Sequence, residues 1–257
     1  MLAVLTLWQR EIVRFVRQRS RVVGALVQPI VFWILLGGGL SASFRPPGTP
    51  AGTGYLEYFF PGTIALVLLF TAIFATIAVV EDRRSGFLQG VLVAPVARRS
   101  IVLGQTLGGT TLAVVQGLLF LAIAPLAGMP LTALRVLATT GTMALVAFGL
   151  TNLGLLIAWR MESTQGFHAI MNLILLPIWF LSGAFFPATN APAILRWLMQ
   201  LDPLTYGVAA VRSCMYLGGD AGFRDLPSLG VSLAITAAFG LVTFVAATAV
   251  AERSATL

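Results

Sequence analysis

The side chains that most often carry catalysis or bind metals are scarce in this chain of 257 residues. His168 is its only histidine and Cys214 its only cysteine, which excludes a multi-histidine metal site and an intrachain disulfide. All sixteen basic residues are arginine. Because a phosphate-binding loop ends in Lys-Ser or Lys-Thr, the chain has no such loop, and any ATP that powers it must be bound by another polypeptide. We therefore expect no metal site and no ATPase site in this chain.

Arginines near the N-terminus follow a helical spacing. Arg10, Arg14, Arg17 and Arg21 are separated by four, three and four residues, so they fall on one face of a helix, with apolar residues roughly opposite. This pattern predicts that residues 1–21 form an amphipathic helix lying on the membrane surface. A signal peptide is the alternative, which the long basic preface and the later apolar runs disfavour.

Residues 81–100 are charged at both ends and apolar in the middle. They begin with Glu-Asp-Arg-Arg and end close to a second pair of arginines. A solvated loop needs no apolar centre, whereas a short amphipathic helix that docks into a groove of a partner protein does. Pro95 would end such a helix. The alternative, which the sequence leaves about equally open, is that the next membrane span begins early and packs this apolar centre on lipid.

The composition indicates a membrane protein. Hydrophobic residues make up 58% of the chain and charged residues 10%, against about 25% charged residues in ordinary soluble domains. The formal net charge is +7, but the arginines cluster between apolar runs. That distribution is typical of cytoplasmic loops facing anionic lipid and not of a nucleic-acid-binding domain. We therefore expect membrane lipid, and no nucleic acid, as a partner.

The apolar runs predict an all-α membrane protein with six transmembrane helices. Placing the N-terminus inside puts eleven of the sixteen arginines in the cytoplasm, and this bias predicts that both termini are cytoplasmic. In the third run, Gly104-x-x-x-Gly108 has a spacing that lets two helices approach closely. The predicted spans cover residues 22–41, 59–80, 101–125, 134–158, 169–186 and 227–250.

Residues 187–226, before the last span, contain two apolar runs that are each too short to cross the bilayer. Asp202-Pro203 separates the two runs. Re-entrant helices that dip in from the outer side and return would explain them, because neighbouring helices could satisfy their ends. The alternative is a small helical cap outside the membrane. The shortness of the runs favours the re-entrant interpretation.

The middles of the predicted spans contain essentially no ionisable side chains. Ion-coupled carriers relay charge through buried carboxylates or histidines, and voltage sensors use arginine ladders, so both classes are disfavoured. An intramembrane enzyme is also disfavoured, because no nucleophile–base pair is visible. The polar groups at membrane depth are amides: Gln28, Gln105, Gln116, Asn152 and Asn172.

Two stretches resemble the ATP-binding-cassette type-2 permeases, a family of bacterial drug, polysaccharide and lipid exporters. Residues 81–98 resemble the family's loop that couples to the ATPase, with acidic and basic residues, a glycine, an apolar run, a proline and an arginine. Residues 181–187, Leu-Ser-Gly-Ala-Phe-Phe-Pro, and 201–207, Leu-Asp-Pro-Leu-Thr-Tyr-Gly, are similar to the family's outer signature. The family usually has Asn where this chain has Asp202.

This resemblance implies a permease of the bacterial inner membrane in which residues 1–257 form a single transmembrane domain. It implies a homodimer or heterodimer of permeases bound to two copies of a separate nucleotide-binding subunit, which carries ATP and Mg²⁺, so that this chain has no cofactor of its own. The substrate would be an amphiphilic or hydrophobic drug, lipid or glycan. The residues expected to couple to the ATPase are Arg10, Arg14, Glu81, Arg83, Arg84, Gly86, Leu88 and Pro95.

In this family the second and fifth spans line the transport path, although for any single candidate here ordinary packing against helices or lipid is the favoured explanation. Phe185 and Phe186 could form an outer hydrophobic gate, or could anchor the chain at the membrane interface. A membrane protein that works without an ATPase, such as an intramembrane lipid-modifying enzyme, is the alternative function. The candidate path residues are Phe70, Phe74, Asn172 and Phe180.

Overall fold

The computed structural model describes residues 1–17, 19–41, 54–188, 191–218 and 226–253, and every regular element among them is helical. The all-α prediction is therefore confirmed for these residues. Five helical stretches are long and apolar enough to cross a membrane. They are Tyr55–Arg84, which comprises α4 (Tyr55–Ala75) and α5 (Ile77–Arg84), then α7 (Arg98–Leu121), α8 (Ala133–Ala158), α9 (Thr164–Leu181) and α12 (Leu229–Arg253).

The first predicted span, 22–41, takes a different form. The helix continues from α2 (Arg19–Phe32) through a π-helix, η1 (Trp33–Gly38), into α3 (Gly39–Ser41). Its apolar part, Val27–Gly38, is shorter than the five long helices. Within the described residues, five helices and not six therefore have the length and composition of a complete span.

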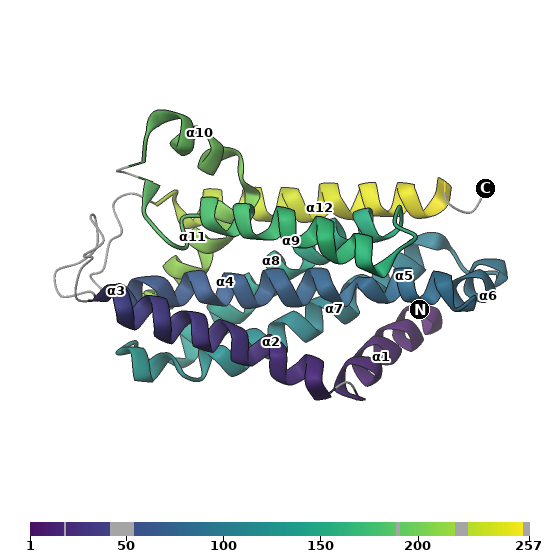
Figure 1. Ribbon diagram of the computed structural model, residues 1–257, viewed down its shortest axis with the longest axis horizontal. Coiled ribbons are helices and arrows are strands. Elements are labelled where there is room, and N and C mark those ends of the chain that lie inside the picture. The colour runs from purple at the N-terminus through teal and green to yellow at the C-terminus, as the bar shows by residue number, and fades with distance from the viewer. Residues whose placement is uncertain (18, 42–53, 189–190, 219–225, 254–257) are drawn as a thin grey trace.

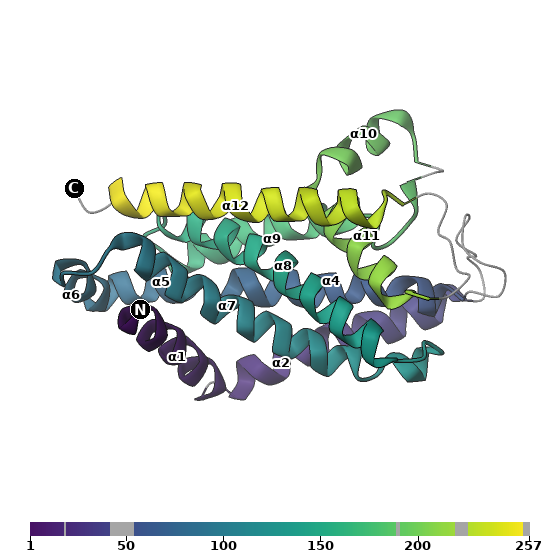
Figure 2. The same ribbon diagram turned by 180° about the vertical axis from the view of Figure 1, so that it is seen from behind.

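Helix α4 lies at the centre of the bundle, with α2 on one side and α9 on the other (Figure 1). In the apolar part of Tyr55–Arg84, 83% of the residues are buried, because α4 also packs on α7, α8 and α11. A helix that is apolar all round is stable inside a bundle or in lipid, and these contacts place α4 inside the bundle. Helices α9 and α12 are only 22% buried by the same measure and lie at the periphery (Figure 2). Their apolar outer faces are free to contact lipid or another protein.

Helix α1 (Leu2–Arg17) packs across α7 at the pair of glycines that the sequence singles out. A Cβ atom on Gly104 would lie 2.9 Å from the Cβ of Leu7, and one on Gly108 would lie 2.7 Å from the Cβ of Glu11. Real Cβ atoms do not approach this closely, so only glycine leaves room for α1. The predicted close helix approach is confirmed, and its partner is the N-terminal helix.

The charged and apolar segment after α5 folds as a separate short helix. Helix α5 ends at Arg84, Gly86 has a positive φ of 79°, and α6 runs over Phe87–Val93. Glycine adopts this left-handed conformation without the strain that a Cβ atom adds. Pro95 follows α6, and α7 begins at Arg98. Of the two interpretations of this segment, the structure has the short helix and not an early start of the next span.

The segment between α9 and α12 contains two short helices. Helix α10 (Ala193–Leu201) projects from the bundle, and α11 (Pro203–Met215) packs against α4, α8 and α12 (Figure 1). Asp202 separates them and caps α11, because its carboxylate oxygen accepts a hydrogen bond from the backbone N–H of Leu204 at 2.9 Å.

Candidate functional site

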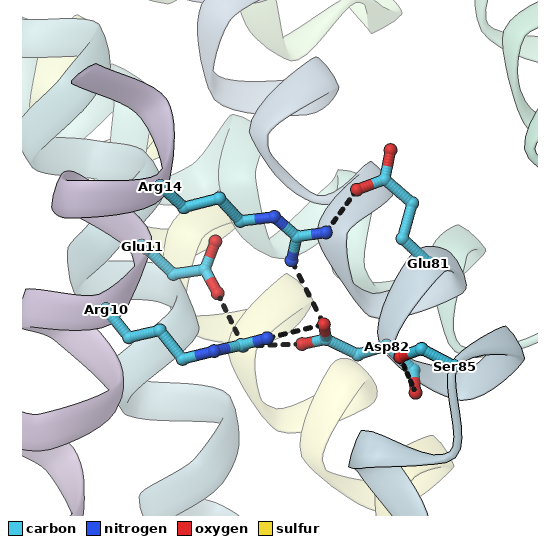
Figure 3. Close-up of polar contacts among 6 residues, drawn as sticks. All are labelled: Arg10, Glu11, Arg14, Glu81, Asp82 and Ser85. Carbon is cyan, nitrogen blue, oxygen red and sulfur yellow. Dashed lines mark hydrogen bonds and ion pairs between the residues drawn. The ribbon is translucent and has the colours of Figure 1, made fainter. Parts of the chain in front are cut away.

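Two arginines of α1 and two carboxylates of α5 form an ion-pair cluster (Figure 3). The guanidinium of Arg10 donates to both carboxylate oxygens of Asp82, at 2.6 Å each. Arg14 donates to Asp82 at 3.0 Å and also pairs with Glu81. Two-pronged arginine–carboxylate contacts are among the strongest in proteins. The cluster therefore fixes α1 to the end of α5, although Arg10 and Asp82 are 72 positions apart in the sequence.

The carboxylate of Asp82 is stable at this place only because it is paired. Its side chain is 4% exposed, and a buried carboxylate without a partner is costly. Arg10 also lies 3.3 Å from Glu11. The hydrogen bond to Asp82 raises the pKa of the Arg10 guanidinium, and together with the attraction of both carboxylates it outweighs the opposing effect of burial.

The same arginine connects α1 to the short helix α6. The guanidinium of Arg10 lies 3.9 Å from the centre of the Phe87 ring, within the range of a cation–π contact. The next residue, Leu88, is 3% exposed and belongs to the hydrophobic core. Helix α6 is therefore attached on both sides, to α1 through Phe87 and to the bundle through Leu88.

Arg83 faces a different neighbour. Its guanidinium donates to the backbone carbonyls of Trp159, at 2.7 Å, and Met161, at 3.1 Å, and lies 6.0 Å from the Trp159 ring centre. These carbonyls follow the C-terminus of α8, where carbonyl groups lack helical partners and a positive charge is favourable. Arg83 thus caps α8 and holds the loop that leads into α9.

The eight predicted coupling residues separate into three groups according to their contacts. Arg10, Arg14, Glu81 and Arg83 make the polar contacts of this region, while Gly86 and Leu88 shape and anchor α6. Two further predicted residues, Arg84 and Pro95, are exposed and lie outside these contacts.

A cavity of about 470 Å³ lies between α2, α4 and α9. Of the predicted path residues, it is lined by Phe70, Phe74 and Asn172. The sequence pattern did not indicate that His168 also faces this space; its ring lies 5.1 Å from the ring of Phe74. Among the residues that the structure describes, the lining consists of Phe15, Gly24, Gln28, Phe70, Thr71, Phe74, Ala75, His168 and Asn172.

Phe180, the fourth predicted path residue, lies outside the cavity lining. Its ring packs 5.2 Å from Trp179 and 5.4 Å from Phe185. Phe185, a predicted gate residue, belongs to an aromatic cluster that also includes Tyr55. The Tyr55 hydroxyl donates to the Phe185 carbonyl at 3.0 Å. Phe186, the other predicted gate residue, follows in the chain and is half-buried.

Next to the aromatic cluster, Arg212 of α11 is buried, with 2% of its surface exposed. It donates to the carbonyls of Tyr58 and Gly183, at 3.3 Å each, and lies 4.2 Å from the Tyr58 ring centre. Arg212 therefore joins α4, α11 and the end of α9. An arginine inside an apolar run signals such a role, but its partners lie far away in the sequence.

The bundle of long apolar helices defines a multi-pass membrane protein, and comparisons with known proteins identify its family. A family model described as "ABC-2 type transporter" matches residues 3–216. The chain belongs to this family. It is 27% identical over 243 residues to Nodulation protein J of Sinorhizobium fredii (strain NBRC 101917 / NGR234), covering 91% of this chain and 86% of that protein.

A second relative matches a similar share of the chain. The Inner membrane transport permease YadH of Escherichia coli (strain K12) is 26% identical over 251 residues, covering 93% of this chain and 92% of that protein. These matches make the chain a transmembrane permease subunit of an ABC transporter. Such a permease is not itself an ATPase, which agrees with the missing lysine.

Proposed function

We propose that this permease exports an amphiphilic or hydrophobic drug, lipid or glycan, using ATP hydrolysed by a separate subunit. Two copies of that nucleotide-binding subunit, with ATP and Mg²⁺, would bind the cytoplasmic ends of a permease dimer. The observation that carries the proposal is the set of contacts made by three consecutive residues. Glu81 and Asp82 hold α1, and Arg83 holds the end of α8.

These contacts lead to opposite walls of the cavity. Helix α1 leads into α2, which contributes Gln28 to the cavity. The loop that Arg83 holds leads into α9, which contributes His168 and Asn172. A displacement of α5 and α6 by the nucleotide-binding subunit would therefore shift both walls. Coupling between distant sites requires such a connected chain of contacts.

A hollow beside the ion-pair cluster supports a docking role for this end of the bundle. It has a volume of about 500 Å³ and is lined by Arg10, Val13, Arg14, Arg17, Asp82 and Ser85. Arg17 is exposed there. An acidic side chain of the nucleotide-binding subunit would complement this basic surface.

The placement of residues 19–41 supports a sixth span. Arg10, just before this segment, binds Asp82 at one end of Tyr55–Arg84, whereas the indole of Trp33 donates to the Leu56 carbonyl, at 3.0 Å, near the other end. The segment therefore runs along the length of α4. The N-terminus and the end of α12 lie at the same end as α6 (Figure 1), which supports two cytoplasmic termini in a bacterial inner membrane.

Helix α1 and the pair of helices α10 and α11 have separate proposed roles at opposite sides of the membrane. Helix α1 would lie in the inner membrane interface, with its exposed Leu5 and Val16 toward lipid. Helices α10 and α11 would form the outer re-entrant segment, since α11 packs among long helices while Trp197 of α10 is 65% exposed.

The exposed side of the bundle formed by α2 and α9 supports a dimer of permeases. Gln28, His168 and Asn172 are exposed there beside the apolar side chains of Val27 and Leu173. Polar side chains at membrane depth are costly when they face lipid and are satisfied between helices or in a water-filled space. A second permease facing this surface would enclose the two cavities as one transport path.

The test exchanges the charges of the central ion pair. Asp82→Arg places a third cation beside Arg10 and Arg14, so we expect stimulated ATP hydrolysis by the copurified nucleotide-binding subunit to be lost. The double variant Arg10→Asp, Asp82→Arg restores opposite charges and should recover part of the stimulation. Both are measured on the reconstituted complex, with the exposed Glu162→Arg as a matched charge reversal at the same end.

Two results would contradict the proposal. Wild-type stimulation in Asp82→Arg would show that the ion pair has no part in coupling. Purification in mild detergent without any nucleotide-binding subunit would show that the permease works alone.

A further inference from the structure

The cavity between α2, α4 and α9 combines flat apolar surfaces with uncharged polar groups. The rings of Phe70 and Phe74 lie 5.6 Å apart, and the ring of His168 lies 5.1 Å from Phe74 at an angle of 35°. Gln28 and Asn172 add two amides, each of which both donates and accepts hydrogen bonds. The volume of about 470 Å³ lies within the usual range of small-molecule sites.

The same lining offers little to a charged ligand. Among the described residues around the cavity, His168 is the only ionisable one. Phe15 of α1 also lines the space, but the preceding residue, Arg14, pairs with Glu81 and Asp82. A charged group in a site of low dielectric needs a partner of opposite charge. Among the described lining residues there is no carboxylate for a cation and no arginine for an anion.

We propose that this cavity selects a neutral amphiphile whose head group carries several hydroxyl or amide groups, as a sugar ring does. The face of the ring would stack on Phe74 and His168, and its hydroxyls would exchange hydrogen bonds with Gln28 and Asn172. The inference rests on the proposed transport function and narrows its substrate class. Aromatic faces also attract cations, but without a carboxylate that attraction does not compensate for the lost hydration.

The exposed surface beside the cavity suits the tail of such a molecule. Val27 and Val31 of α2 are 49% and 44% exposed, and Leu173 and Leu176 of α9 are 75% and 38% exposed. These side chains border the cavity-lining Gln28 and Asn172 in the sequence. An alkyl tail can therefore remain against apolar side chains while the head group occupies the cavity.

The test uses the permease with its nucleotide-binding subunit in lipid nanodiscs and a photoreactive decyl glucoside as the probe. Mass spectrometry should find the label on residues 70–75 or 168–172. Decyl maltoside, decyltrimethylammonium and decyl sulfate then compete for the site, since they share one tail and differ in head-group charge. We expect the maltoside to displace the probe at a concentration about tenfold lower than either charged competitor.

Variants of the two amides test the assigned contacts. Gln28→Leu and Asn172→Leu should each reduce labelling affinity by about fivefold or more, because each leaves a head-group hydroxyl without its partner. Gln165→Leu removes an exposed amide of α9 outside the cavity and should leave labelling unchanged. His168→Phe preserves the ring contact and should have a smaller effect than either amide variant.

Equal or stronger competition by a charged amphiphile would contradict the neutral substrate class, as would label that lies only outside the cavity. Unchanged labelling in both amide variants would contradict the assigned contacts. If the cavity preferred a charged head group while the permease still stimulated ATP hydrolysis, this inference alone would be overturned. Neutral selectivity without coupled ATP hydrolysis would overturn the proposed function and leave the inference standing.

Discussion

Asp202 shows how a single side chain can set the stability of the segment between α9 and α12. One carboxylate oxygen caps α11 through the N–H of Leu204, and the side chain is buried. Loss of water raises the pKa of Asp202 to about 7, although the hydrogen bond from Leu204 acts in the opposite direction. The protonated form of Asp202 is therefore favoured in the folded protein below about pH 7.

This raised pKa predicts a specific dependence of stability on pH. Because the pKa of Asp202 in the fold, about 7, exceeds the ordinary value of 3.8, the folded state binds the proton more tightly than the unfolded state. The contribution of Asp202 to stability should therefore be greatest below about pH 4, fall as pH rises to about 7, and then level off. Asp202→Asn keeps the capping oxygen and cannot titrate, so its thermal midpoint should lack this component.

The measurement is the thermal unfolding midpoint of the purified permease across that pH range. Glu162→Gln, which removes an exposed carboxylate, is the control and should follow the wild type. A pH profile of Asp202→Asn that coincides with the wild-type profile would contradict the assignment.

At the scale of the element, the turn between α5 and α6 depends on Gly86. Its φ of 79° costs a residue with a Cβ atom about 1–2 kcal/mol. Gly86→Ala should therefore loosen α6 and lower coupled ATP hydrolysis. Gly90→Ala, inside α6, should instead stabilise this helix, since alanine stabilises a helix interior by about 1 kcal/mol over glycine. At either position an added Cβ meets no atom within 4 Å, so only backbone conformation differs.

Hydrogen exchange of the α6 amides in the complex measures this pair of variants. Faster exchange in Gly86→Ala and slower exchange in Gly90→Ala are expected. A change of the same sign in both would mean that packing of α6, and not the conformation of the turn, determines its stability.

The sequence predicted elements better than it predicted their partners. Apolar runs located the long helices, because burial in lipid is a local property. The charged ends of residues 81–100 marked the segment that contains α6 but left its form open between a short helix and an early start of the next span. The partners of Arg83 are carbonyls 76 and 78 positions away in the sequence. The packing of α1 on Gly104 and Gly108 requires two helices to cross. Such contacts depend on the relative rotation of packed helices, which no local pattern encodes.

The candidate cavity illustrates the same limit. The candidates were chosen on the expectation that the second and fifth spans line the path, and three of them, Phe70, Phe74 and Asn172, line the cavity between α2, α4 and α9. Phe180 lies further along α9 than Asn172 and packs with Phe185 instead. The contact of His168 with Phe74 could not be predicted, because nothing near His168 in the sequence shows which helix it faces.

For the whole molecule, the proposed topology predicts which surfaces reagents can reach. In a Cys214→Ser background, a membrane-impermeant maleimide should label Gly54→Cys and Leu126→Cys in intact cells. Ser85→Cys and Glu162→Cys lie at the opposite end and should react only after permeabilisation. All four positions are exposed, so accessibility depends on the side of the membrane. The reverse pattern, or labelling of all four in intact cells, would contradict the topology.

Because Asp82 and Arg83 are adjacent in the sequence, α5 should not tolerate a change in length between them. Successive side chains on a helix point about 100° apart, and these two residues of α5 hold different neighbours, α1 and the end of α8. The insertion of a single residue between them would turn one side chain away from its neighbour while the other stayed in place. No such change in length is compatible with both contacts, so insertions should be tolerated in the outer loops and excluded from this junction.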